Sequence, residues 1–249
     1  MSTLQIGKKY EISQGRVLRV LVKHGIPRRP LPEAMRKAAR KYYIDEDYFS
    51  NIDSELKAYT LGYFIAEAYL RLKIHGCSEA YVKVSINELE HLQKLLSLFS
   101  KYPVRIVCGS KEPVSKVEIT STGLVKDLNR WGVPFPKEQA RFPKINHSLF
   151  NHFIRGAWDG DGTIYKHHGQ WTFAICGSYF LIEKIQQVLV RNCNVRQVKI
   201  WKDTRKETLF YLQYMGNKQV PRILRWLYNQ ATIYFDKKYY KAQCCLAET

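Results

Sequence analysis

Two stretches decide the fold, Leu61-Gly-Tyr-Phe-Ile-Ala-Glu67-Ala68 and Arg155-Gly-Ala-Trp-Asp-Gly-Asp161-Gly162. Each lies in a segment with helical character, one beginning near residue 53 and the other running through 153–162. Gly62 and Gly156 are separated by 94 residues, and so are Glu67 and Asp161. One shared offset for a small residue and an acid indicates an internal repeat rather than two unrelated helices.

The same succession of segments follows each stretch. Alternation of polar and apolar residues predicts half-buried strands over 69–74, 81–86, 104–108 and 116–120, and again over 163–167, 171–176, 195–201 and 208–214. Amphipathic patterns predict helices over 88–100 and 123–131, and over 179–192, 218–228 and 234–243. The order α-β-β-α-β-β-α therefore occurs twice. This order predicts an α+β fold built from two related halves.

The repeat divides the chain into four parts. Residues 52–132 form the first half, 133–146 a linker with three prolines, and 147–249 the second half with its C-terminal helix. Residues 1–51 form a basic helical arm, whose first 41 residues carry eleven Lys/Arg and only two acids. Helices over 6–13 and 14–25, ahead of a basic helical stretch over 33–43, resemble part of a helix-turn-helix DNA reader. A packed or tethering arm is the alternative.

The charge of the whole chain points to the same kind of partner. Its 40 Lys+Arg outnumber its 22 Asp+Glu, which leaves a net charge of +18 that favours a polyanion such as nucleic acid. No apolar run approaches the ~18 residues of a membrane span, and no secretory signal opens the chain, so we expect an intracellular protein without membrane contact. The six cysteines lack C-x-x-C spacing, which predicts reduced thiols rather than a zinc site or disulfides.

The repeated helices also carry the chemistry. Small residues lie four apart in each, Gly62 with Ala66 and Gly156 with Gly160, so two helix backbones can approach closely along one face. Glu67 and Asp161 would then lie close together at two helix C-termini, where both the carboxylates and the helix dipoles are negative. A cation is needed there. Carboxylates together with the Ala66 and Gly160 carbonyls suit Mg²⁺, which supports phosphodiester hydrolysis.

With these motifs, residues 52–243 resemble the LAGLIDADG homing endonucleases of the single-chain, two-motif type. The resemblance implies a monomer whose two pseudo-symmetric, saddle-shaped antiparallel sheets lie in the DNA major groove. It implies metal-dependent double-strand cleavage at a long target site, with Mg²⁺ replaceable by Mn²⁺ and Ca²⁺ supporting binding without cleavage. Glu67 and Asp161 match the essential acids of the motif. The basic residue near the active centre of each half would be Lys137 in the first, and Lys237 or Lys238 in the second.

Two departures from the motif leave alternatives open. Glu67 stands where Asp is commoner, and Ala68 replaces the usual Gly, so a strand-biased nickase is one alternative. An RNA-splicing maturase with intron RNA as its partner, or a non-cleaving DNA-binding protein, is another. Asp159 has Ile65 as its counterpart and is interpreted as structural or solvent-facing. A freestanding or intron-encoded protein of a prokaryotic or phage-infected cell fits best, acting in its cytoplasm or nucleoid, with an organelle as the alternative.

Period-two alternation assigns one face of each sheet to the core and the other to DNA. Polar and basic side chains on the open face could read base edges. The residues predicted to contact DNA are Arg71, Lys73, His75, Tyr81, Lys83, Ser85, Arg105, Lys116 and Glu118 in the first half, and Tyr165, His167, Gln170, Thr172, Gln197, Lys199, Trp201, Tyr211 and Gln213 in the second.

Overall fold

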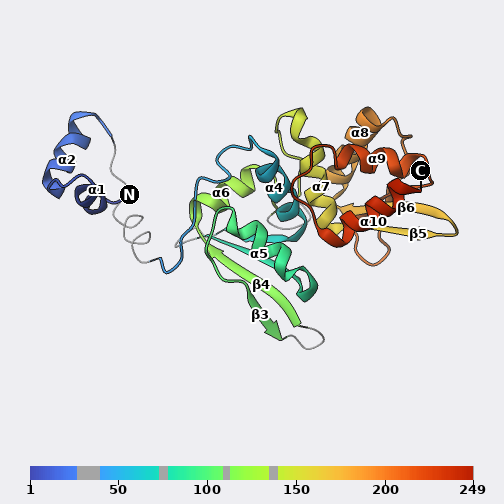
Figure 1. Ribbon diagram of the computed structural model, residues 1–249, viewed down its shortest axis with the longest axis horizontal. Helices are drawn as coiled ribbons and strands as arrows, with labels where there is room; N and C mark the ends of the chain where they lie inside the picture. Colours follow the sequence, from blue (N-terminus) through green and yellow to red (C-terminus); the bar gives the residue numbers. More distant parts are fainter. Residues whose placement is uncertain (27–39, 73–77, 109–112, 135–139, 249) are drawn as a thin grey trace. The chain divides into compact units, whose positions relative to one another are not determined.

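The computed structural model of the chain describes residues 1–26, 40–72, 78–108, 113–134 and 140–248 (Figure 1). These residues belong to two units, Met1–Tyr43 and Ile44–Thr249, referred to below as the N-terminal unit and the main unit. None of the described helices has the length and apolar character that a bilayer span requires. The described cysteines, Cys108, Cys176, Cys193, Cys244 and Cys245, are free thiols.

The N-terminal unit contains two short helices, α1 (Thr3–Lys9) and α2 (Gln14–Lys23). Each is preceded by a serine, Ser2 or Ser13, whose hydroxyl accepts a backbone N–H that the first turn leaves without an intrahelical partner. A helix was expected over residues 33–43, of which residues 33–39 lie outside the described residues. Residues 40–43 are not helical, because the chain runs there into the antiparallel pairing of Ile44 with Ser100.

The main unit repeats one succession of elements. Its first half consists of α4 (Glu55–Glu67), β1 (Ala68–Arg71), β2 (Glu79–Ser85), the 3-10 turn η1 (Ile86–Glu88), α5 (Leu89–Ser97), β3 (Arg105–Cys108), β4 (Pro113–Thr120) and α6 (Thr122–Arg130). Its second half consists of η3 (His147–Leu149), α7 (Phe150–Asp161), β5 (Gly162–His167), β6 (Gln170–Gly177), α8 (Tyr179–Cys193), β7 (Trp201–Lys202), β8 (Phe210–Met215), α9 (Gln219–Leu227) and α10 (Asp236–Ala247).

Both halves have the same sheet topology. The strands are all antiparallel, in the order β1-β2-β4-β3 in the first half and β5-β6-β8-β7 in the second. Identical order in two sheets of four strands is what a duplicated sequence would produce. The predicted α+β fold with two related antiparallel sheets is therefore confirmed.

Helices α4 and α7 run side by side between the two halves (Figure 1). Every residue from Ala58 to Ala66 in α4, and from Asn151 to Asp159 in α7, is buried. Burial over this whole length places both helices at the centre of the core rather than on its surface. The remaining helices of each half cover the core faces of its sheet.

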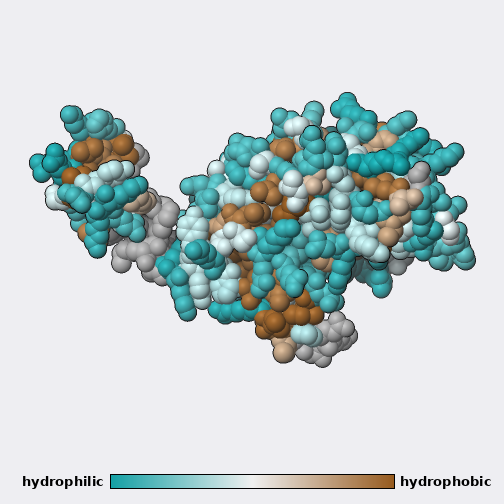
Figure 2. Space-filling model, in the orientation of Figure 1, coloured by the Kyte–Doolittle hydropathy of each residue, from teal (hydrophilic) through white to brown (hydrophobic). Residues whose placement is uncertain are grey.

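The predicted core faces are largely correct. Val82 and Val84 on β2, and Trp171, Phe173 and Ile175 on β6, are buried as the alternation predicts. Apolar side chains also lie exposed at one end of the first sheet, where Ile106 and Val107 on the edge strand β3 are 57% and 42% exposed. Figure 2 shows this apolar patch over β3 and β4 on a surface that is otherwise mostly hydrophilic.

One predicted strand is wrong. Residues 195–200 do not form a ladder, and β7 is limited to Trp201–Lys202. The Gln186 side chain of α8 donates a hydrogen bond to the Val198 carbonyl at 2.7 Å, and the Arg196 N–H donates to the Gln219 Oε1 at 2.9 Å. Helix side chains thus satisfy backbone groups that a strand would have paired with its neighbour.

Candidate active site

The contact between α4 and α7 depends on two glycines. A Cβ atom on Gly62 would lie 2.0 Å from the Phe153 carbonyl oxygen, and one on Gly156 would lie 2.0 Å from the Tyr59 carbonyl oxygen. Backbone atoms cannot retreat as a flexible side chain can, so any larger residue at either position would push the helices apart. The two helix backbones therefore touch directly, and the last turns of both helices are brought together.

Glu67 and Asp161 are the last residues of α4 and α7. A Cβ atom on Gly160 would lie 2.4 Å from the Ala66 Cβ and 3.5 Å from the Glu67 Oε1, so the Glu67 carboxylate lies against the final turn of α7. Both acids are half-buried. The structure thus brings one acid from each half to the same end of the helix pair.

Lys238 brings a cation to this region. Its ammonium donates hydrogen bonds to the Trp158 and Asp159 carbonyl oxygens, both at 2.7 Å, and so occupies the C-terminal end of α7. Burial lowers the pKa of Lys238, and the carboxylates of Asp159, Glu88, Glu67 and Asp161 act in the opposite direction. The Lys238 ammonium interacts electrostatically with both Glu67 and Asp161, so it offsets part of the negative charge at the helix ends.

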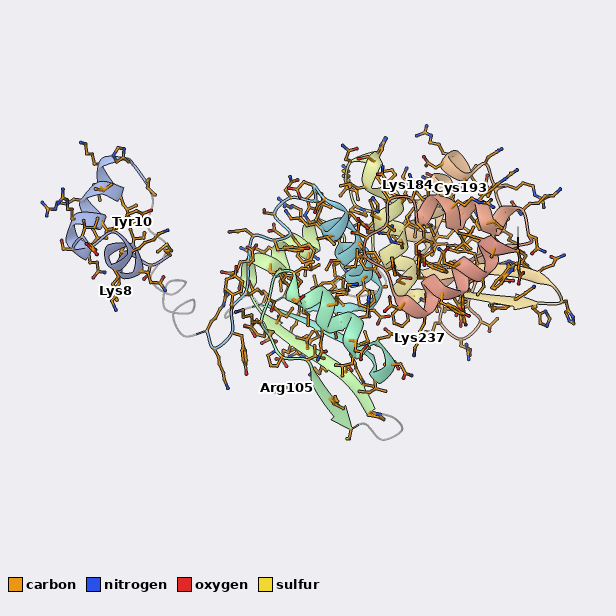
Figure 3. All side chains as sticks on the ribbon, in the orientation of Figure 1. Lys8, Tyr10, Arg105, Lys184, Cys193 and Lys237 are labelled. Atoms are coloured by element: carbon orange, nitrogen blue, oxygen red, sulfur yellow. The ribbon has the colours of Figure 1, made fainter. Side chains whose placement is uncertain are left out.

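The other two predicted lysines are placed differently. Lys237, the neighbour of Lys238 in α10, is exposed (Figure 3). Successive residues of a helix point about 100° apart, so when Lys238 turns inward its neighbour turns to solvent. Lys137 lies outside the described residues.

Asp159 does not face solvent. It is 1% exposed, and its Oδ2 accepts hydrogen bonds from the Tyr59 hydroxyl at 2.6 Å and the Phe235 N–H at 3.0 Å. Burial raises the pKa of Asp159 to about 6, although Lys238 and the two hydrogen bonds act against the rise. Asp159 therefore has structural contacts. The alternative that it faces solvent is wrong, because the helix pair encloses its side chain.

Two polar links between the halves were not foreseen from the sequence. The Tyr59 hydroxyl lies 2.9 Å from the His91 Nε2, which extends the Asp159 contact into the first half. Farther along the same helices, the fully buried Arg155 guanidinium contacts the Glu55 carboxylate at 2.6 Å. A basic residue between the apolar residues Ile154 and Ala157 was the available signal, because a buried charge requires a partner.

The acid pair suits a hard divalent cation. Among the described residues, no group of three or more His, Cys, Asp and Glu side chains could hold a metal. Glu67 and Asp161 therefore offer two carboxylates, and the last turns of their helices add carbonyls that have no intrahelical partner. Mg²⁺ typically binds only a few protein oxygens, and water and phosphate complete its coordination shell. The predicted ligands Ala66 and Gly160 lie in these turns.

The open face of the first sheet is largely as predicted. Arg71 and Lys83 are exposed and Tyr81 is half-buried on this face, with Ser85, Arg105, Lys116 and Glu118 beside them. The Arg71 guanidinium and the Lys116 ammonium lie 5.1 and 5.0 Å from the centroid of the Tyr81 ring, which arranges two cations about one aromatic platform. Tyr69 shares this face and is 46% exposed; the alternation that identified Arg71 would also have identified it. Lys73 and His75 lie outside the described residues.

The second sheet requires one correction. Thr172 pairs with Tyr165 and Met215 on the predicted open face, yet it is fully buried because larger neighbours cover it. Other predicted residues are accessible: His167, Gln170 and Trp201 are exposed, Tyr165 is 41% exposed, and Tyr211 and Gln213 are half-buried. Gln197 and Lys199 are exposed but precede β7, and the Lys199 ammonium lies 4.1 Å from the centroid of the Trp201 ring.

Comparison with solved structures supports this architecture. No family model matches the sequence, and no curated protein matches it. Among solved structures, I-SmaMI, bound to its uncleaved DNA target in the presence of calcium ions, is 13% identical with a TM-score of 0.53, and the match covers 79% of this chain and 92% of that one. The LAGLIDADG meganuclease I-CpaMI, bound to uncleaved DNA, is 11% identical with a TM-score of 0.52 and the same coverage. The chain therefore has the single-chain, two-motif fold of the LAGLIDADG homing endonucleases.

Proposed function

We propose that this chain is a site-specific DNA endonuclease that requires a divalent metal and cuts both strands of a long duplex target. One observation carries the proposal. Two carboxylates, Glu67 and Asp161, end two helices whose backbones touch, and the buried ammonium of Lys238 lies at the same helix ends. A purely structural role does not explain why both halves place an acid where the helix dipoles are unfavourable to it.

The DNA partner is supported by charge and shape. Each half presents an antiparallel sheet whose open face carries basic and aromatic side chains, among them Arg71, Lys116 and Trp201. The chain has a net charge of +18. Both solved structures named above were determined with DNA. One chain carries both halves, so we propose a monomer on duplex DNA.

Mg²⁺ is the proposed metal, held by the Glu67 and Asp161 carboxylates with help from the Ala66 and Gly160 carbonyls. When bound, such an ion would supply Lewis-acid activation of water and of the scissile phosphate. We propose that Mn²⁺ substitutes for it and that Ca²⁺ supports binding without cleavage. The Glu67 carboxylate would orient the water molecule that attacks the scissile phosphate of one DNA strand. The Asp161 carboxylate would do the same for the other strand.

Lys238 is proposed to assist as a charged neighbour of both acids. Its two hydrogen bonds to the end of α7 hold the ammonium in place, and its charge limits the repulsion between the carboxylates when no metal is bound. Lys137 is the proposed counterpart in the first half. Lys237 is exposed and is not needed for this role.

The test begins by selecting cleaved members from a randomised DNA library in Mg²⁺, which supplies a target. Glu67→Gln and Asp161→Asn are then compared with the wild-type chain in single-turnover cleavage and in binding with Ca²⁺. Each variant should lose cleavage by at least about 100-fold while it still binds, because the amide retains the shape but lacks the charge. Glu183→Gln is the matched control, because the Glu183 carboxylate lies on α8 and accepts its hydrogen bond from Tyr179 of the same helix. Cleavage at the wild-type rate by the Glu67→Gln/Asp161→Asn double variant would overturn the proposal.

A nickase is the second candidate function, and the unequal helix ends favour it. Glu67 reaches its position on a longer side chain than Asp161, and Ala68 follows the first helix where Gly162 follows the second. A Cβ on Gly162 would lie 2.1 Å from the Trp158 ring, so the two helix ends differ in their packing. A nickase converts supercoiled target plasmid to open circles, whereas cleavage of both strands gives linear DNA. Binding of intron RNA with no DNA cleavage in any metal would favour a maturase.

A further inference from the structure

One face of α2 carries a stripe of cations. Arg16, Arg19 and Lys23 are all exposed. At about 100° per residue, their spacing of three and four places them within roughly 60° of one another around the helix. Val17, Leu18 and Leu21 occupy the opposite arc, where Val17 is 3% exposed and the other two are half-buried. The basic stripe therefore points away from the apolar side of the helix.

The local charge is strongly one-sided. Residues 1–26 contain five Lys/Arg and a single acid, Glu11. Lys8 and Lys9 end α1, where a cation is favourable to the helix dipole, and both are exposed. Lys8 is labelled in Figure 3. Residues 1–41 carry half of the positive surplus of the chain in about a sixth of its length. The partner that relieves such a charge is a polyanion.

The two helices contact each other across the short turn that joins them. A Cβ on Gly7 would lie 2.7 Å from the Ile12 carbonyl oxygen, so α1 presses directly against the turn that leads into α2. The Ser13 hydroxyl accepts the Arg16 N–H at 3.3 Å and fixes the start of α2. A helix held at a fixed angle behind a short turn is the form in which a helix-turn-helix presents its second helix to the major groove.

Val20, an exposed apolar residue of α2, is also consistent with DNA binding by this helix. Val20 lies about 40° from Arg16 around the helix, at the edge of the stripe, and is 46% exposed. Apolar side chains on a major-groove helix contact the thymine methyl group, while neighbouring Arg and Lys contact phosphates or guanine. An acidic protein partner would explain the cations but not this exposed apolar residue beside them.

We propose that the N-terminal unit is a second DNA-binding site, with α2 in the major groove of duplex DNA that flanks the cleavage site. The inference rests on the proposed function for its DNA partner, and it adds a separate contact that lengthens the target on one side. In the sequence, residues 27–43 separate the α1–α2 pair from the main unit. Seventeen residues can span at most about 60 Å, which is enough to reach flanking base pairs. Tethering of this kind raises the effective concentration of the second site.

The test uses the full chain and two duplexes, one with the selected target and about 20 flanking base pairs on each side, and one trimmed to the segment that the two sheets protect. The full chain should protect additional base pairs on one flank only. Removing that flank should weaken binding on the order of 100-fold. Binding is measured in Ca²⁺ over a series of salt concentrations.

The informative variant is Arg16→Ala/Arg19→Ala/Lys23→Ala. It should bind the long duplex no better than the wild-type chain binds the trimmed one, and its salt slope should fall by about 3, close to 0.9 per lost phosphate contact. Lys184→Ala/Arg191→Ala/Arg225→Ala is the matched control, because it removes three exposed charges from α8 and α9. The control should keep the long footprint.

The outcomes separate this inference from the proposed function. Equal footprints and equal affinities on the two duplexes would overturn the inference and leave the endonuclease intact. Preference of the N-terminal unit for RNA, or a triple variant with the wild-type footprint and salt slope, would also overturn it. Absence of binding to any selected duplex would instead remove the proposed function itself. The single-turnover cleavage rate of bound target should be unchanged in the triple variant.

Discussion

Asp159 and Asp161 have the same chemistry, are two residues apart and have different surroundings. Positions two apart on a helix point in different directions, so one side chain enters the contact between α4 and α7 while the other ends the helix. Asp159 bonds to Tyr59, and Tyr59 in turn contacts His91. His91 is 7% exposed, and burial, with smaller effects from Lys94 and Lys238, lowers its pKa to about 4.

His91 should make the stability of the main unit depend on pH. Its folded pKa lies below the unfolded value of 6.5, so the unfolded chain takes up a proton between pH 6.5 and 4 that the folded chain does not. Stability is therefore fully present above pH 6.5 and is lost as pH falls towards 4. Between pH 7.5 and 5 the loss from this residue is about 2 kcal/mol. Urea unfolding should show a flatter pH dependence for His91→Gln than for the wild-type chain.

The matched control for this prediction is His147→Gln. His147 is exposed at η3, so its replacement should leave the pH dependence of the wild-type chain in place. Identical pH profiles for His91→Gln and the wild-type chain would show that the imidazole is not kept neutral by burial.

At the scale of the elements, two glycines set the distance between α4 and α7. Gly62 and Gly156 are the points where each backbone meets a carbonyl oxygen of the other helix. Glycine normally weakens a helix interior by about 1 kcal/mol relative to alanine. This loss occurs at both Gly62 and Gly156. It is offset by the close approach of the α4 and α7 backbones, which brings the ends of both helices together.

Replacement of either glycine should therefore harm both folding and cleavage. Gly62→Ala and Gly156→Ala each force a methyl group against a carbonyl oxygen at 2.0 Å, and we expect a loss of about 3 kcal/mol in unfolding free energy. Cleavage should fall further than stability alone explains, because the two acids move apart. Chemical unfolding and single-turnover cleavage measure the two effects.

Gly123 provides the contrast, because it is also a helical glycine of the main unit. A Cβ at Gly123 would meet only the Glu46 side chain, at an ordinary 3.7 Å, so Gly123→Ala should leave stability unchanged or slightly raised. If the alanine variants at Gly62 and Gly156 matched Gly123→Ala, the close contact between the helices would be disproved.

At the scale of the whole molecule, ionic and polar contacts join the two halves. Glu55 at the start of α4 receives the Arg155 guanidinium and hydrogen bonds from the Thr232 and Ile233 N–H groups and from the Thr232 hydroxyl. Burial alone would raise the pKa of Glu55, but the two Thr232 hydrogen bonds and the charges of Arg155 and His152 outweigh burial and lower it. Glu55 is thus ionised in the fold, and the stability it contributes is present above its unfolded pKa and lost in acid.

This ion pair should couple the halves energetically. We expect a double-mutant cycle on Glu55→Gln and Arg155→Gln to give a coupling of about 1 to 3 kcal/mol, because each single change leaves a buried partner unsatisfied. The Lys166–Glu248 pair has the same separation of 2.6 Å, but both side chains are largely exposed, so its cycle should give a much smaller value. Comparable couplings for the two pairs would show that burial does not decide their strength. Denaturant unfolding measures both cycles.

Local features of the sequence predicted much of this architecture. The common offset of Gly62 with Gly156 and Glu67 with Asp161 gave the duplication, and alternation gave most strands and their core faces. These features could be read because periodicity and small-residue spacing are properties of short segments. The strand over 195–201 was mistaken for the same reason, since alternation does not reveal that Gln186 and Gln219 bond to that backbone.

The sequence by itself determined that two alike halves meet through glycines and that each contributes one acid at the meeting point. Only the tertiary structure decided that Lys238 and not Lys237 turns towards those acids, that Thr172 is covered, and that Asp159 and Arg155 bond across the halves. The physical reason is distance along the chain. Tyr59 and Asp159, or Glu55 and Arg155, are 100 residues apart, and such partners are chosen by packing in three dimensions rather than by any local pattern.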